Sequence, residues 1–167
     1  GATGPVRVLS VAIGGYGFHY LRTFWDQVPR DAAVLAGVVD PQARSSPIWP
    51  EVEAAGVPVA DTMEAFYAGG HAIDLAVVVS PIQAHVPQSL VALAHGSHVL
   101  CDKPLGATIQ DARALVAARD RAARLSGGLQ AGGRDTARAR RRRGRHRHRV
   151  GRCAACFGTV PRRACRA

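Results

Sequence analysis

Short apolar runs alternate with helix-length segments along the first three quarters of the chain. The runs are predominantly apolar at successive positions, which is typical of strands buried on both faces of a parallel sheet. The predicted strands are 6–13, 33–40, 57–60, 75–79 and 98–101. The predicted helices are 18–27, a segment ending near 55, 62–68, 87–94 and 109–124. This alternation predicts an α/β fold with a doubly wound parallel sheet.

The length of 167 residues allows one ordinary domain and a small addition, because a single core usually occupies about 100–150 residues. We therefore divide the chain into a domain at 1–124 and a tail at 125–167. No apolar run is long enough to cross a membrane, and residues 1–5 lack the features of a secretory signal. We expect a cytoplasmic protein with no membrane partner.

The net charge of +10 is confined to one end of the chain. Residues 1–125 contain 9 Lys and Arg and 11 Asp and Glu, whereas residues 126–167 contain 13 Arg and one Asp. The domain is therefore slightly acidic. The tail has neither strand nor helix periodicity, and we expect it to be disordered.

Two interpretations of the tail stay open. Its arginines are suited to neutralising phosphates, although only Phe157 offers a ring for base stacking. The pairs His146/His148 and Cys153/Cys156 match no common zinc module, so no metal site is expected.

The second interpretation is that the tail is translated from the wrong frame of a GC-rich gene. The chain has no Asn and one Lys, whose codons are AT-rich. Residues 127–130 can be encoded by GGT GGG CTA CAG, which read one base later gives Val-Gly-Tyr. If no neighbouring frame of the sequenced gene encodes a second domain, this hypothesis is wrong.

The turn after the first predicted strand carries a G-x-G-x-x-G pattern with alanine in first place, at Ala12, Gly14 and Gly17. Gly15 and Tyr16 complete it. Small residues let the backbone approach a pyrophosphate at the N-terminus of the following helix, where free N–H groups favour anions. Because a strand precedes the turn and a helix follows it, the pattern predicts a Rossmann NAD(P)-binding domain.

The second predicted strand ends on Asp40, 23 residues after Gly17. That interval suits an acidic residue that binds the adenosine ribose hydroxyls, which favours NAD over NADP. Arg44 follows closely and is a candidate for a 2′-phosphate contact, so NADP stays open. A loop Asp that turns the chain before Pro41 is the simpler alternative for Asp40.

Residues 74–85 and 92–105 resemble two further motifs of the glucose–fructose oxidoreductase and inositol dehydrogenase (Gfo/Idh/MocA) family, in the same order and at the same separation. The resemblance covers about 120 residues. It implies oxidation or reduction of a sugar or cyclitol hydroxyl with NAD or NADP.

The resemblance also implies roles for single residues. Lys103 is implied to be catalytic, because the family's lysine reaches the nicotinamide ribose and the substrate hydroxyl. Lys103 is also the only lysine among 22 basic residues. Asp102 stands where the family usually has Glu. The expected cofactor-binding residues are Ala12, Gly14, Gly15, Tyr16, Gly17, Asp40, Arg44, Ser80, Pro81, His85, Asp102, Lys103 and Pro104.

Family members continue into a second, α+β domain that covers the nicotinamide and supplies a catalytic His. No sheet-forming sequence of that kind follows residue 124. We therefore expect a truncated chain that binds dinucleotide and is inactive alone. The alternative is a non-catalytic nucleotide-binding or scaffold module whose basic tail binds nucleic acid.

Overall fold

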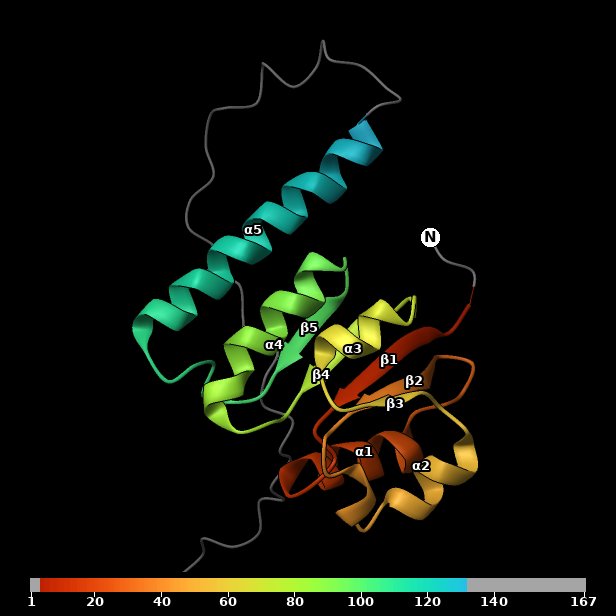
Figure 1. Cartoon of the computed structure of the whole chain (residues 1–167). Coiled ribbons are helices and arrows are strands. Elements are labelled where there is room, and N and C mark those ends of the chain that lie inside the picture. Colours follow the sequence, from red (N-terminus) through yellow and green to blue (C-terminus); the bar gives the residue numbers. More distant parts are fainter. Residues whose placement is uncertain (1–3, 132–167) are drawn as a thin grey trace, which may run out of the picture. The chain divides into compact units, whose positions relative to one another are not determined.

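The computed structural model describes the backbone of residues 4–131 and the side chains of residues 4–123. Five parallel strands form one sheet in the order β3-β2-β1-β4-β5 (Figure 1). The strands are β1 (Val6–Val11), β2 (Ala33–Val39), β3 (Val59–Ala60), β4 (Leu75–Val78) and β5 (His98–Cys101). The predicted doubly wound α/β fold is confirmed.

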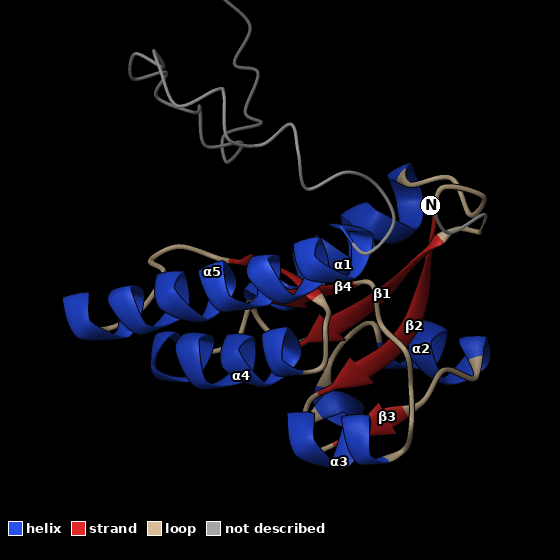
Figure 2. Cartoon of the chain, turned by 90° about the horizontal axis from the view of Figure 1, so that it is seen from above, coloured by secondary structure: helices blue, strands red, loops and turns tan. Residues whose placement is uncertain are grey.

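Helices cover both faces of the sheet. The helices are α1 (Tyr16–Gln27), η1 (Ala43–Ser45), α2 (Trp49–Ala55), α3 (Met63–Ala68), α4 (Ile82–Ala94) and α5 (Ile109–Ala131). In Figure 1, α1 and α2 lie below the sheet, and α3, α4 and α5 lie above it. Figure 2 shows α4 and α5 packed side by side.

Each face of the sheet has its own apolar core. On one side, Leu21 of α1 and Val52 of α2 pack with Val38 of β2. On the other side, Phe66 of α3 and Ala92 of α4 belong to the cluster that contains the centre of the sheet. The last four residues of β1 are all buried, because this strand has helices on both faces.

Helix α4 begins five residues earlier than the sequence predicted. Pro87 suggested a first helical position, where proline is common. In the structure the helix begins at Ile82, with Pro81 as its N-cap, and Pro87 lies inside it. Proline has no N–H, so the helix lacks the bond that residue 87 would donate to the carbonyl of Gln83.

Helix α5 continues to Ala131, past its predicted end at residue 124. Helix growth adds one hydrogen bond for each residue that is fixed, so a long Ala- and Arg-rich segment propagates readily. The rest of the predicted tail, residues 132–167, lies outside the described residues. No helix between residues 4 and 131 has the length and apolar character needed to span a membrane.

Candidate functional site: a glycine turn at the carboxyl edge of the sheet

The strand order places a topological switch point at the carboxyl ends of β1 and β4. The chain leaves β1 toward β2 on one side, and it leaves β4 toward β5 on the other. Open α/β sheets bind ligands where the connections diverge in this way. The turn after β1 and the segments after β4 and β5 therefore share one edge of the sheet.

The residues 12–17 that follow β1, the glycine turn, use small side chains for three different reasons. Ala12 has a φ of 65°, so the first position makes a tight, left-handed bend. A Cβ on Gly17 would lie 2.0 Å from the carbonyl oxygen of Ala12, so only glycine lets α1 pack this close to the turn. A Cβ on Gly14 would meet no atom within 4 Å, so the backbone there is open to a ligand.

Backbone N–H groups in the glycine turn are available to an anion. Within residues 4–131, the amides of Gly14 and Gly15 donate to no protein acceptor. Helix α1 begins directly after them and has neither a side-chain cap nor an acidic residue in its first turn. The first N–H groups of a helix lack intrahelical partners and carry a partial positive charge. Together these groups suit a phosphate.

Asp40 lies at the carboxyl end of β2 and contacts the glycine turn. Its Oδ2 accepts a hydrogen bond from the N–H of Ile13 at 2.8 Å, and its Oδ1 accepts one from the N–H of Gln42 at 2.8 Å. Each carboxylate oxygen has a second lone pair, so both oxygens remain able to accept a bond from a ligand. Arg44 lies farther along, with its guanidinium 5.8 Å from the centre of the Trp49 ring.

His85 joins the segments that follow β4 and β5. The side chain is buried, with its Nε2 2.7 Å from the carbonyl oxygen of Ser80 and its Nδ1 2.9 Å from that of Pro104. The hydroxyl of Ser80 donates to Gln88 Oε1 at 2.5 Å. With both ring nitrogens facing backbone carbonyls, His85 holds 80–81 against 103–104. It offers no free nitrogen to a ligand.

Helix α1 also contacts the segment after β5. The ammonium of Lys103 lies 5.7 Å from the centre of the Tyr16 ring, and the hydroxyl of Tyr20 donates to Asp102 Oδ1 at 3.2 Å. Burial and the neighbouring Asp102 carboxylate raise the pKa of Tyr20. The Lys103–Pro104 peptide bond is cis. Tyr20 and Asp102 are 82 positions apart in the sequence, and their contact ties the segment after β5 to the N-terminal half of α1.

The structure therefore gathers most of the predicted residues into two linked groups. In the first group, the glycine turn contacts Asp40. In the second group, His85 joins the segment with Ser80 and Pro81 to the segment with Lys103 and Pro104. Tyr16 links the two groups, because its ring lies near the Lys103 ammonium. Arg44 makes none of these contacts. Sequence reasoning missed Tyr20, although its spacing of four from Tyr16 places both on one helix face. It also missed Ser46, whose hydroxyl donates to the carbonyl oxygen of Ile13 in the glycine turn and which no sequence pattern distinguished.

A parallel sheet with an open glycine turn at its switch point defines a nucleotide-binding Rossmann domain. Residues 7–127 match the family described as "Oxidoreductase family, NAD-binding Rossmann fold" (Gfo/Idh/MocA). The chain belongs to this family.

Solved structures share the fold. The WlbA dehydrogenase from Bordetella pertussis, in complex with NADH and UDP-GlcNAcA, matches with a TM-score of 0.62 and 22% identity over 71% of this chain and 36% of that chain. The myo-inositol 2-dehydrogenase from Lactobacillus plantarum matches with a TM-score of 0.59 and 20% identity over 70% and 33%.

A sequence relative is similar over a short stretch. The 1,5-anhydro-D-fructose reductase from Ensifer adhaerens is 44% identical over 46 residues, which are 28% of this chain and 14% of the reductase. The chain thus spans about a third of the length of the two solved structures and a smaller share of the reductase.

Proposed function

We propose that the glycine turn binds the diphosphate of a nicotinamide dinucleotide, with the adenosine ribose at Asp40 and the nicotinamide side near Lys103. The observation that carries this proposal is the pairing of an open Gly14 with a Gly17 that is tightly packed. The complex of the Bordetella pertussis dehydrogenase with NADH supports the choice of ligand. A titration with NADH, followed through the fluorescence of Trp25 and Trp49, tests it.

NAD is the preferred form of the cofactor in this proposal. A 2′-phosphate would place negative charge beside the Asp40 carboxylate, whose position the Ile13 and Gln42 amides fix. Arg44, the candidate for a 2′-phosphate contact, lies over Trp49.

The Asp40→Asn variant tests this preference. We expect this variant to bind NADH less tightly than the wild-type chain does. We also expect its affinity for NADPH to be closer to its affinity for NADH, because the charge that repels the 2′-phosphate is gone. The ratio of the two dissociation constants is the measurement, since any general loosening of the turn affects both ligands. A ratio equal to that of the wild-type chain would remove Asp40 from cofactor selection.

The reaction class that we propose is hydride transfer between nicotinamide and a hydroxyl-bearing carbon of a sugar or cyclitol. The names of the inositol dehydrogenase and of the anhydrofructose reductase support that substrate class. The nicotinamide ring supplies the hydride acceptor when it is bound. Lys103 provides a positive charge beside the substrate hydroxyl. The residues around it form the edge of the sheet on the nicotinamide side and hold the segment with Lys103 in place; they are Asp102, Ser80, Pro81, His85 and Pro104.

We propose that this chain binds dinucleotide without turning over substrate. Catalysis requires a group that positions the substrate over the nicotinamide and excludes water. Among the described residues, Lys103 is the one side chain that we assign to the substrate, and the turn at Gly14 is open. Oxidation of a polyol by the purified 167-residue chain with NAD would contradict this.

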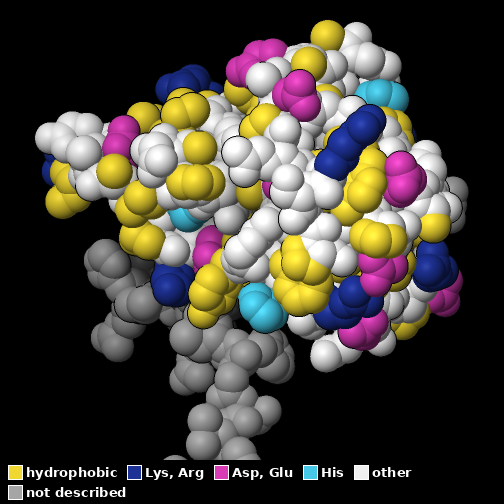
Figure 3. All heavy atoms as spheres, turned by 60° about the horizontal axis from the view of Figure 1, so that its bottom comes forward, with side chains coloured by type: hydrophobic (Ala, Val, Ile, Leu, Met, Phe, Trp, Pro, Cys, Tyr) yellow, Lys and Arg dark blue, Asp and Glu magenta, His cyan; other side chains and the backbone are white. Residues whose placement is uncertain are grey.

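The rival proposal is a non-catalytic nucleotide-binding or scaffold module whose basic tail, residues 125–167, binds nucleic acid. The described domain adds no second basic surface in support of it. Figure 3 shows side chains of both charges interspersed on one face, without a continuous basic patch there. Residues 1–125 also contain more acidic than basic side chains. Salt-sensitive binding of DNA without any response to NADH would favour the rival.

A further inference from the structure

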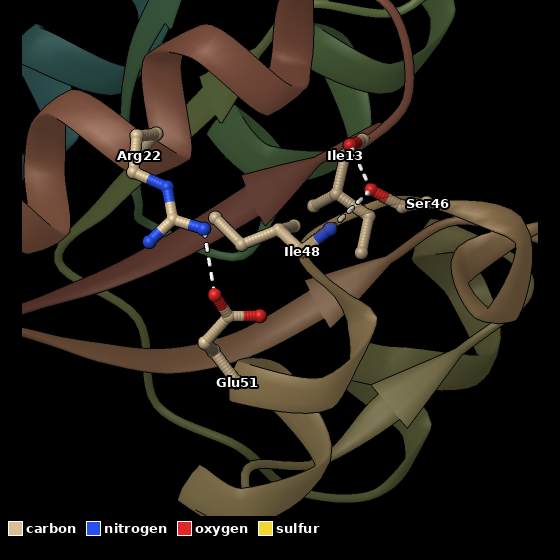
Figure 4. A network of polar contacts seen from close by, with 5 residues as sticks. All are labelled: Ile13, Arg22, Ser46, Ile48 and Glu51. Atoms are coloured by element: carbon tan, nitrogen blue, oxygen red, sulfur yellow. Dashed lines mark hydrogen bonds and ion pairs between the residues drawn. The ribbon is translucent and has the colours of Figure 1, made fainter.

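Ser46 lies below the glycine turn and contacts its backbone. The residue is 6% exposed, and its hydroxyl donates to the carbonyl oxygen of Ile13 at 2.6 Å (Figure 4). The same hydroxyl oxygen accepts the N–H of Ile48 at 3.4 Å. A hydroxyl has one proton to donate, and here it is directed to Ile13.

Ile13 is therefore fixed on both sides of its backbone. Its N–H donates to Asp40 Oδ2, and its carbonyl accepts from Ser46. Ile13 itself is completely buried. Two side chains from the connection between β2 and α2 thus set the orientation of one residue in the turn after β1.

Fixing the Ile13 carbonyl also orients the N–H of Gly14. The two groups belong to one trans peptide unit, in which C=O and N–H point in opposite directions. Because the carbonyl points inward to Ser46, the Gly14 N–H points to the opposite side, where the glycine turn is open.

Gly14 does not secure this orientation by itself. Glycine populates more backbone conformations than other residues do, so the peptide before it rotates more easily. A rotated peptide would direct the Ile13 carbonyl oxygen, instead of an N–H, toward a bound anion. An electronegative oxygen there would repel a phosphate.

We propose that Ser46 is a positioning residue that holds the Gly14 amide toward the diphosphate of the bound dinucleotide. This inference rests on the proposed function of the glycine turn. It adds a residue outside the G-x-G-x-x-G pattern and assigns its effect to one ligand group, the diphosphate.

The segment that carries Ser46 is itself tied to α1. Arg22 of α1 and Glu51 of α2 form an ion pair with 2.6 Å between Nη2 and Oε1, also seen in Figure 4. Ile48, whose N–H meets the Ser46 hydroxyl, comes directly before α2. The segment that holds Ile13 and the helix that completes the anion site are therefore connected.

The test compares Ser46→Ala with Ser45→Ala. Ser45 is the exposed neighbour of Ser46 and serves as the matched control. NMR titrations with ADP and with adenosine separate the diphosphate contribution from that of the base and ribose. We expect Ser46→Ala to weaken ADP binding by about tenfold and to leave adenosine binding unchanged, as expected for one hydrogen bond to a charged group. Ser45→Ala is expected to match wild type.

The outcomes distinguish the two proposals. A wild-type chain that binds neither ADP nor NADH would overturn the proposed function itself. A wild-type chain that binds ADP no more tightly than Ser46→Ala does would overturn only the role of Ser46.

A second measurement applies even if Ser46→Ala does not fold. In the wild-type chain, we expect ADP to shift the Gly14 amide resonance strongly and to slow its exchange with solvent. An unchanged Gly14 resonance, with shifts confined to Gly15 and Tyr16, would overturn the role of Ser46.

Discussion

At the scale of single residues, neighbouring glycines of the same turn have different tasks. Gly17 permits close packing, because a Cβ there would lie 2.0 Å from the Ala12 carbonyl oxygen. Gly14 faces open space. The sequence pattern treats the two alike, but the structure assigns one to stability and leaves the other open to a ligand.

Two alanine variants separate these tasks. We expect Gly17→Ala to lower the free energy of unfolding by about 1–3 kcal/mol, because the added methyl group must displace backbone. Gly14→Ala is expected to leave stability nearly unchanged. Thermal unfolding of both variants checks this, and equal losses in the two would contradict the division of roles.

The residue scale also shows where sequence reasoning reached its limit. Asp40 was predicted from its interval after Gly17, and the structure places it against the turn. Its bond to the Ile13 amide was not predictable, since every residue except proline has a backbone N–H and the sequence therefore does not indicate which one a side chain binds. Ser46 was missed for the same reason, because a serine that binds a carbonyl looks like any loop serine.

At the scale of elements, α1 connects the two ends of the site. Its first turn completes the glycine turn, and Tyr16 and Tyr20 reach the segment after β5. The same helix is paired to α2 through Arg22 and Glu51. Movement of α1 would therefore disturb both the proposed diphosphate end and the proposed nicotinamide end.

The Tyr20→Phe variant tests the second of these contacts. Without the hydroxyl, Asp102 loses its donor and the segment with Lys103 is less firmly held. We expect a several-fold loss of NADH affinity, while the affinity for ADP, which lacks the nicotinamide end, stays at the wild-type value. Equal losses for the two ligands would show that Tyr20 acts on the whole fold.

The Arg22–Glu51 pair predicts a small pH dependence of stability. The hydrogen bond from Arg22 lowers the pKa of Glu51 below its usual value of 4.5. A lowered carboxyl pKa adds stability above the unfolded pKa, and this is lost as the pH falls through the folded pKa. The contribution is modest because the two side chains are 38% and 42% exposed, so that solvent screens the ion pair.

Comparison of Glu51→Gln with Glu53→Gln measures this contribution. Glu53 lies on the same helix and is the matched control. Urea denaturation is expected to show Glu51→Gln less stable than Glu53→Gln at neutral pH, with the difference shrinking as the pH falls below 4.5 and through the lower pKa of folded Glu51. A difference that persists in acid would contradict an electrostatic origin.

Element boundaries were less predictable than element order. The alternation of apolar runs predicted the five strands, because buried parallel strands need apolar residues on both faces. The start of α4 was misplaced, since Pro87 has the same appearance whether it begins a helix or lies inside one. The end of α5 was misplaced because cooperative helix growth depends on the whole segment.

At the scale of the whole molecule, the described domain resembles one part of larger oxidoreductases. It spans about a third of the solved relatives, and those relatives share its fold. The proposed cofactor edge is assembled from segments after β1, β2, β4 and β5. Its chemistry is therefore a property of the folded sheet and not of any one motif.

The most direct test of the central claim is the NADH affinity of Gly14→Val beside that of the wild-type chain. The added side chain would meet no protein atom near its Cβ but would occupy the space assigned to the diphosphate. Gly4→Val, at an exposed position whose Cβ also meets no atom, is the control. We expect Gly14→Val to lose NADH affinity by at least about tenfold with unchanged melting, and Gly4→Val to match wild type. Equal NADH affinity in all three proteins would contradict the assignment of the glycine turn.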